Sequence, residues 1–139
     1  TNENTPFIPG KGNVMKDGED VCIITMGLMV PVAMKAAAIL EQEGISTAVV
    51  NMHTIKPIDK DIILSMNKKC RGIVTAEEHS IIGGLGSAVA EVIAGKNECG
   101  FARVGIEDKF GKSGKPEDLF KAYGLTVENI ITKCKETLR

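Results

Sequence analysis

The feature that most constrains the fold of this chain is a repeated alternation of short apolar runs with segments of helical character. The apolar runs cover residues 21–26, 47–52 and 73–76, and each is bounded by polar or glycine residues. Such runs are typical of strands that are covered on both faces of a sheet. Because strands that alternate with helices are joined by right-handed crossovers, the pattern predicts a mainly parallel sheet with helices on both faces.

Turn and capping residues set the limits of the first two helices. Pro31 suits the first turn of a helix over residues 30–43, where its missing N–H costs nothing. Gly44 follows as the glycine that ends this helix. Asp59 is placed to cap a second helix over residues 60–68, because its carboxylate can accept N–H groups of the first turn.

The helix expected after the third apolar run has one apolar face. Its small and apolar residues recur at helical spacing, which predicts that this face is buried against the sheet. They are Ala88, Val89, Val92 and Ile93.

The last third of the chain is expected to contain a fourth strand and two further helices. The strand covers residues 102–106 and is followed by a charged loop over residues 107–115. A short helix is expected over residues 116–123, because it opens on a proline. Thr126 is placed to cap a final amphipathic helix.

Residues 1–20 have a different composition from the rest of the chain. Proline and glycine among polar residues are typical of an extended arm, and two apolar pairs at 7–8 and 14–15 could add an edge strand. We expect residues 1–20 to be a linker from a preceding domain and residues 21–139 to form the domain itself. The chain begins with Thr1 rather than methionine, which agrees with a processed product or a piece of something longer.

Length and charge restrict the class of protein. The chain has 139 residues, enough for one domain with a hydrophobic core, and a formal net charge of −1. A net charge so close to zero does not indicate binding to nucleic acid or to an anionic membrane surface. No apolar run reaches the ~18 residues of a spanning helix, and the first residues lack a signal-peptide pattern. We expect a cytoplasmic protein that binds neither nucleic acid nor membranes.

The four cysteines do not form a motif. They stand at positions 22, 70, 99 and 134, with no C-x-x-C pair and no histidine at zinc-site spacing. We expect free thiols of a reducing compartment, and a disulfide is the less favoured alternative.

The polar residues most suited to chemistry follow the third apolar run. Glu77, Glu78, His79 and Ser80 are expected to form a turn after the strand, where α/β sheets place their chemistry. His79 is a candidate proton donor or substrate-hydroxyl contact, with Glu77 or Glu78 orienting it. The alternative, which we weight more heavily, is a solvated turn that caps the following structure. His53 is expected to be a loop residue beside the same edge of the sheet.

A glycine-rich bend comes next and consists of Gly83, Gly84 and Gly86, followed by Ser87. Glycine lets a helix N-terminus approach another backbone closely and supplies any positive φ that the bend needs. The N–H groups at such a helix end can also bind an anion such as phosphate. These four residues are therefore a candidate interface or anion-contact loop.

The glycine motifs do not complete a nucleotide-binding fingerprint. After Gly84 and Gly86 a dinucleotide site needs a third small residue at the position of Val89, and it should follow the first strand. Residues 111–113 resemble the end of a P-loop, but that motif needs glycine at the position of Ile106. The chain also has no G-x-S-x-G elbow and no recognisable catalytic triad.

Five segments together carry a resemblance to a known family. They are Gly-Lys-Gly at 10–12, Thr-Met-Gly-Leu-Met-Val at 25–30, Asn-Met-His-Thr-Ile-Lys-Pro-Ile-Asp at 51–59, Glu-Glu-His-Ser-Ile-Ile-Gly-Gly-Leu-Gly-Ser-Ala-Val-Ala-Glu at 77–91, and Asp-Lys-Phe-Gly-Lys-Ser-Gly-Lys-Pro-Glu-Asp-Leu at 108–119. In this combination the chain resembles the C-terminal domain of the transketolase family of thiamine-diphosphate enzymes. The Glu-Glu-His and Thr-Ile-Lys-Pro segments are most similar to those of the C-terminal half of split, two-subunit transketolases.

For the fold, the resemblance implies a three-layer α/β/α domain with a five-stranded, mixed and mostly parallel sheet. The apolar runs supply four strands, so the fifth is expected within residues 1–20.

For function, the resemblance implies the transfer of two-carbon ketol units between sugar phosphates, as in the pentose phosphate pathway, with thiamine diphosphate and Mg²⁺. The family's Gly-Asp-Gly…Asn motif for the diphosphate and metal is absent from this chain. We therefore expect this chain alone to bind no cofactor and to be inactive. Its expected partners are the cofactor-binding domains or subunit of the same enzyme, in a homo-oligomer such as a dimer.

Two other functions stay open. The same domain occurs in deoxyxylulose-phosphate synthase and in 2-oxoacid dehydrogenases, so the resemblance does not fix the substrate. A free-standing anion- or phosphate-binding module, built on the bend at residues 83–87, is the alternative from a different class.

Overall fold

The computed structural model describes residues 11–55, 57–80, 84–96, 99–106 and 125–139. The strands are β1 (Gly12–Lys16), β2 (Val21–Thr25), β3 (Thr47–Met52), β4 (Gly72–Ser80) and β5 (Gly100–Ile106), and the helices are α1 (Met29–Gln42), α2 (Lys60–Lys69), α3 (Leu85–Ile93) and α5 (Val127–Thr137).

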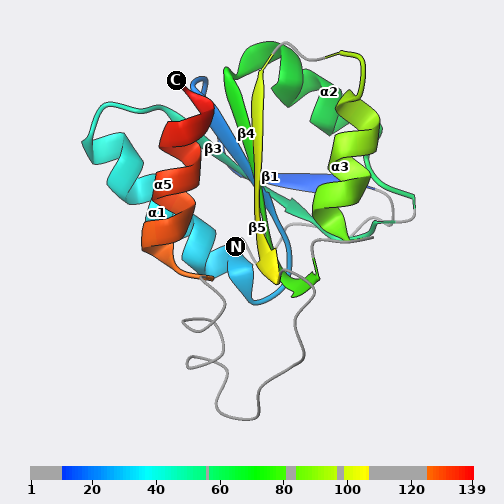
Figure 1. Cartoon of the computed structure of the whole chain (residues 1–139), viewed down its shortest axis with the longest axis horizontal. Helices are drawn as coiled ribbons and strands as arrows, with labels where there is room; N and C mark the ends of the chain where they lie inside the picture. The colour runs from blue at the N-terminus through cyan, green and yellow to red at the C-terminus, as the bar shows by residue number, and fades with distance from the viewer. Residues whose placement is uncertain (1–10, 56, 81–83, 97–98, 107–124) are drawn as a thin grey trace.

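The five strands form one sheet in the order β1-β3-β2-β4-β5. All neighbouring pairs are parallel except β1 and β3, which are antiparallel with Gly12 opposite Met52. Helices α1 and α5 cover one face of the sheet, and α2 and α3 cover the other (Figure 1). The expected three-layer α/β/α domain with a mixed five-stranded sheet is confirmed, and the fifth strand comes from the first twenty residues.

Burial on both faces explains why the central strands read as continuous apolar runs. In β2, Ile23 packs in the core beneath α1 and α5, whereas its neighbours Cys22 and Ile24 pack in the core beneath α2 and α3. Each fully buried aliphatic side chain contributes about 1.5–3 kcal/mol relative to an exposed one. The period of two therefore divides one apolar run between two cores.

The local helix signals act as expected. Asp59 Oδ1 accepts the N–H of Ile62 at 3.3 Å and caps α2. Thr126 Oγ1 accepts the N–H of Asn129 at 3.2 Å and caps α5. Gly44 follows the end of α1 with φ of +83°, a value that favours glycine.

Two strands are longer than predicted. Residues 77–80 were expected to form a turn but continue β4 as far as Ser80, and β5 begins at Gly100 instead of residue 102. The extra length comes from pairing between β4 and β5, which resumes at Ser80 opposite Ile106 after a register shift. The loop and short helix expected at residues 107–123 lie outside the described residues.

All four cysteines are free thiols, as predicted, and three of them are buried. Burial raises the pKa of the Cys70 thiol to about 11 and that of Cys134 to about 12. Within the part of the chain that the structure describes, no helix is long and apolar enough to cross a membrane.

Candidate functional site at the carboxyl edge of the sheet

The carboxyl end of β4 lies at the position where ligands bind in many α/β proteins. From β2 the chain passes through α1 to β3 on one side, whereas β4 lies on the other side of β2. This reversal makes a topological switch point between the ends of β2 and β4. Glu77, Glu78 and His79 all lie on β4 at this end.

Glu77 anchors helix α3. Its side chain is 1% exposed, and its two carboxylate oxygens accept the N–H groups of Leu85 at 2.8 Å and Gly86 at 2.7 Å. The N-cap residue, Gly84, has no side chain to do this. A carboxylate at a helix N-terminus satisfies unpaired amides and interacts favourably with the helix dipole. The Glu77 carboxylate thus occupies the place at the start of α3 where an external anion would bind. It also engages two of the N–H groups that such an anion would need, those of Leu85 and Gly86.

Glu78 lies on the opposite face of β4, since side chains alternate along a strand. Its Oε1 accepts the N–H of Leu28 at 3.3 Å, at the turn into α1. Gly27 in this turn has φ of +61°, and a Cβ there would lie 2.4 Å from Glu78 Oε1. Glu78 therefore occupies the space between the ends of β2 and β4.

Sequence reasoning placed Glu77 or Glu78 beside His79 to orient its ring. The described contacts of both carboxylates are instead to backbone N–H groups that begin α3 and α1. The capping role weighed as the alternative is present, although Glu77 acts from a buried strand and not from a solvated turn. A chemical role for His79 stays a prediction, and its side chain lies outside the described part of the structure.

Gly86 allows α3 to pack closely on the sheet. A Cβ at Gly86 would lie 3.0 Å from both Thr75 Oγ1 and Arg103 Cδ, so the close-approach argument applies here. The φ argument fails for Gly84, which has φ of −97°. Gly83 lies outside the described residues, and a role of this bend in an interface or in anion contact stays a prediction.

Arg103 belongs to this site although sequence reasoning did not select it. It lies on β5 opposite Thr75, donates from Nη1 to Ser87 Oγ at 3.4 Å, and lies 5.6 Å from the centre of the Phe101 ring. The sequence feature that could have identified Arg103 is that it is the one charged residue in an otherwise apolar strand, β5. Its position next to α3 depends on the pairing of β4 with β5.

His53 lies beside the carboxyl edge, as predicted. It follows the last residue of β3 and lines a cavity of about 520 Å³ next to the start of α1. Asn13 Nδ2 lies 2.8 Å from His53 Nε2. The two side chains therefore join β1 to the residue that follows β3 through a hydrogen bond.

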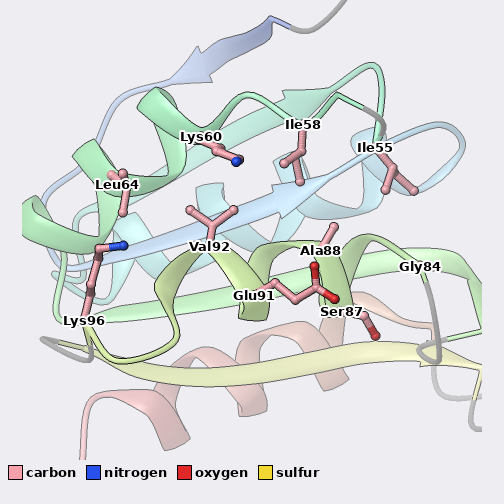
Figure 2. Close-up of a pocket in the computed structure, with 10 residues that line it drawn as sticks. All are labelled: Ile55, Ile58, Lys60, Leu64, Gly84, Ser87, Ala88, Glu91, Val92 and Lys96. Carbon is pink, nitrogen blue, oxygen red and sulfur yellow. The ribbon is translucent and has the colours of Figure 1, made fainter.

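A second hollow lies between α2 and α3 and is called the α2–α3 groove here. Its volume is about 480 Å³, and it opens along both helices with Val92 pointing from α3 toward α2 (Figure 2). It is lined by Ile55, Ile58, Lys60, Leu64, Gly84, Ser87, Ala88, Glu91, Val92 and Lys96. Ala88 and Val92 were expected on the buried face of α3, but both are half-buried and line this groove instead.

Comparison with protein families gives a match over most of the chain. Residues 10–130 match the model of the transketolase C-terminal domain. A protein of Methanocaldococcus jannaschii described as a transketolase C-terminal section is 50% identical over 99% of this chain and 43% of its own length. The 6-deoxy-6-sulfo-D-fructose transketolase subunit SqwH of a Clostridium species is 40% identical, over 96% of this chain and 42% of that protein.

Two further comparisons extend the range of relatives. The 1-deoxy-D-xylulose-5-phosphate synthase of Heliobacterium modesticaldum is 40% identical over 91% of this chain, but only 20% of that enzyme is covered. A solved split-gene transketolase, described as an inactive β4 tetramer, superimposes with a TM-score of 0.93 and 42% identity, over 99% of this chain and 45% of that one. The chain thus spans less than half of the length of these relatives.

Proposed function

The chain belongs to the transketolase C-terminal domain family, and we propose that it is the C-terminal domain of a larger enzyme that transfers two-carbon ketol units between sugar phosphates. In this proposal the domain supports assembly of the enzyme and borders the substrate entrance. The observation that carries it is the bonding of Glu77 and Glu78. Glu77 and Glu78 lie at the carboxyl edge of the sheet, where α/β proteins usually bind ligands, but both accept N–H groups at the starts of helices. This edge therefore has a structural role in the domain.

Thiamine diphosphate and Mg²⁺, which such an enzyme needs, do not fit the described residues. A diphosphate with a metal ion requires anion-binding amides and acidic or polar metal ligands. Two first-turn amides of α3 are engaged by Glu77, and the described ranges contain no group of three or more His, Cys, Asp or Glu that could hold a metal. We assign both cofactors to the remaining domains of the enzyme.

The remaining domains are proposed to precede residue 1, because the matching family model is that of a C-terminal domain. The enzyme is proposed to be a cytoplasmic homo-oligomer, and the solved relative of 42% identity is a tetramer. A deoxyxylulose-phosphate synthase is the second candidate, since relatives of this class reach 40% identity. The free-standing anion module is less well supported, because Glu77 already engages Leu85 and Gly86 at the helix end that it would use.

A ketol-transfer assay tests the proposal. The 139-residue chain is assayed with thiamine diphosphate, Mg²⁺ and sugar phosphates, alone and after addition of the cofactor-binding domains. We expect activity only in the mixture. Ketol transfer by the chain alone would contradict the proposal, and condensation of pyruvate with glyceraldehyde phosphate by the mixture would favour the second candidate. His79→Ala in the active mixture then tests whether this residue contacts substrate.

A further inference from the structure

The cavity beside His53 lies at the carboxyl edge of the sheet and is called the β3–α1 cavity here. Its volume is about 520 Å³, and its lining includes Met26, Gly27, Val30, Pro31, Asn51 and His53. Pockets that enclose small ligands are mostly apolar, contain a few polar groups and measure ~300–1,000 Å³. The β3–α1 cavity has this composition, because Asn51 and His53 are the only polar side chains among the described residues that line it.

Asn51 contributes an unused carboxamide to this cavity. Side chains alternate along a strand, and Val49 packs in the core beneath α1, whereas Val50 packs beneath α2 and α3. Asn51 therefore belongs to the face that α1 covers. Its side chain is half-buried, and within the described part of the chain no hydrogen bond to this carboxamide is present. One donor group and one acceptor oxygen are thus left for a ligand.

The β3–α1 cavity is not suited to an anion. No Lys or Arg is among the described residues that line it. The N–H groups of Leu28, Met29 and Val30 at the start of α1 are bonded within the protein, and proline at position 31 has no N–H. Glu78, which accepts the N–H of Leu28, adds a negative charge nearby. A phosphate or carboxylate group would therefore lose hydration without gaining a partner.

We propose that the β3–α1 cavity binds a small neutral molecule that has an apolar ring and an amide edge. The carboxamide of Asn51 can pair through two hydrogen bonds with a group in which a donor lies next to an acceptor. Val30 and Pro31 then cover the apolar part of the ring. The inference goes beyond ketol transfer, because a sugar phosphate carries the anionic group for which this cavity has no partner.

Three probes with one ring frame test the charge preference. Nicotinamide is neutral, nicotinate has a carboxylate in place of the amide, and 1-methylnicotinamide keeps the amide on a cationic ring. Each is added to the ¹⁵N-labelled 139-residue chain, and backbone amide shifts are followed by NMR. Nicotinamide should shift the signals of Gly27, Asn51 and His53 until saturation, and should bind about tenfold more tightly than either ion. Equal or tighter binding of either ion would overturn the proposal.

Adenine distinguishes two sources of the same chemistry, since a purine ring also presents a donor next to an acceptor. Tighter binding of adenine than of nicotinamide would assign the β3–α1 cavity to a purine-type ring, and the reverse order would assign it to a nicotinamide-type ring. If neither probe shifts the signals of Gly27, Asn51 and His53, the proposal is overturned.

Substitutions then locate the site. Asn51→Ala removes the donor and acceptor pair and should weaken binding of the tighter probe about tenfold, because a two-bond pair is lost. Val30→Phe narrows the cavity and should weaken binding to a similar extent. Ile39→Ala, on a side chain 40% exposed on α1 and outside the lining, is the matched control and should leave binding unchanged. Unchanged binding in both folded cavity variants, or equal weakening by Ile39→Ala, would show that the probe does not bind in this cavity.

Discussion

Two adjacent glutamates on β4 differ completely in what surrounds them. Glu77 faces α3, is buried, and accepts two N–H groups at 2.7 and 2.8 Å. Glu78 faces the turn into α1, is half-buried, and accepts one N–H at 3.3 Å. The residue type and the strand are the same, so the difference comes entirely from what each face of the sheet presents. One carboxylate is a structural anchor, and the other is a partly solvated contact.

The largest expected effect on this comparison is that of Glu77→Ala. The substitution leaves the N–H groups of Leu85 and Gly86 buried without an acceptor and removes a charge from the start of α3. Hydrogen bonds to charged groups contribute about 1.5–3 kcal/mol each, so we expect a loss of about 3 kcal/mol in the free energy of unfolding. Urea denaturation monitored by circular dichroism measures it. Glu77→Gln keeps one acceptor oxygen and should lose less, and equal losses for the two variants would contradict the anchoring role.

Gly27→Ala should have an intermediate effect. A left-handed residue with a Cβ costs about 1–2 kcal/mol, and this Cβ would also meet Glu78 Oε1 at 2.4 Å. A double-mutant cycle with Glu78→Ala separates the two causes. The cost of Gly27→Ala should be smaller in the Glu78→Ala background, because the contact is then gone and only the φ strain remains. An unchanged cost would mean that the Glu78 side chain simply moves aside.

Glu78→Ala alone should have the smallest effect. It removes one long hydrogen bond to Leu28 from a half-buried carboxylate, for which we expect a loss below about 1 kcal/mol. The same urea titration measures this loss. A loss as large as that of Glu77→Ala would show that the two faces of β4 are equivalent, contrary to the comparison.

Local signals were sufficient for much of the fold. Asp59 caps α2 and Gly44 follows α1 as predicted, because a cap depends on residues within one helical turn. The three apolar runs became central strands, because burial on both faces makes such strands predominantly apolar. The edge strand was harder to locate, since β1 is half-exposed and its pairing with β3 is long-range.

The candidate site was predicted as a set of residues but not as an arrangement. Residues 77–80 are polar and follow an apolar run, which locally indicates a turn, yet pairing with β5 keeps them in the strand. Arg103 reached the site only through that same pairing. Ala88 and Val92 have the spacing of a buried face, but α2 does not cover them, so they line the groove.

The sequence by itself determined the α/β class, most of the helix limits and the family, since these depend on short-range periodicity, caps and contiguous motifs. The tertiary structure decided what each polar residue does. A carboxylate takes its role from the amides or solvent that long-range packing brings to it, and neighbours in sequence such as Glu77 and Glu78 point to opposite faces of a sheet. For that reason the strand could be predicted from the sequence, whereas the anchor could not.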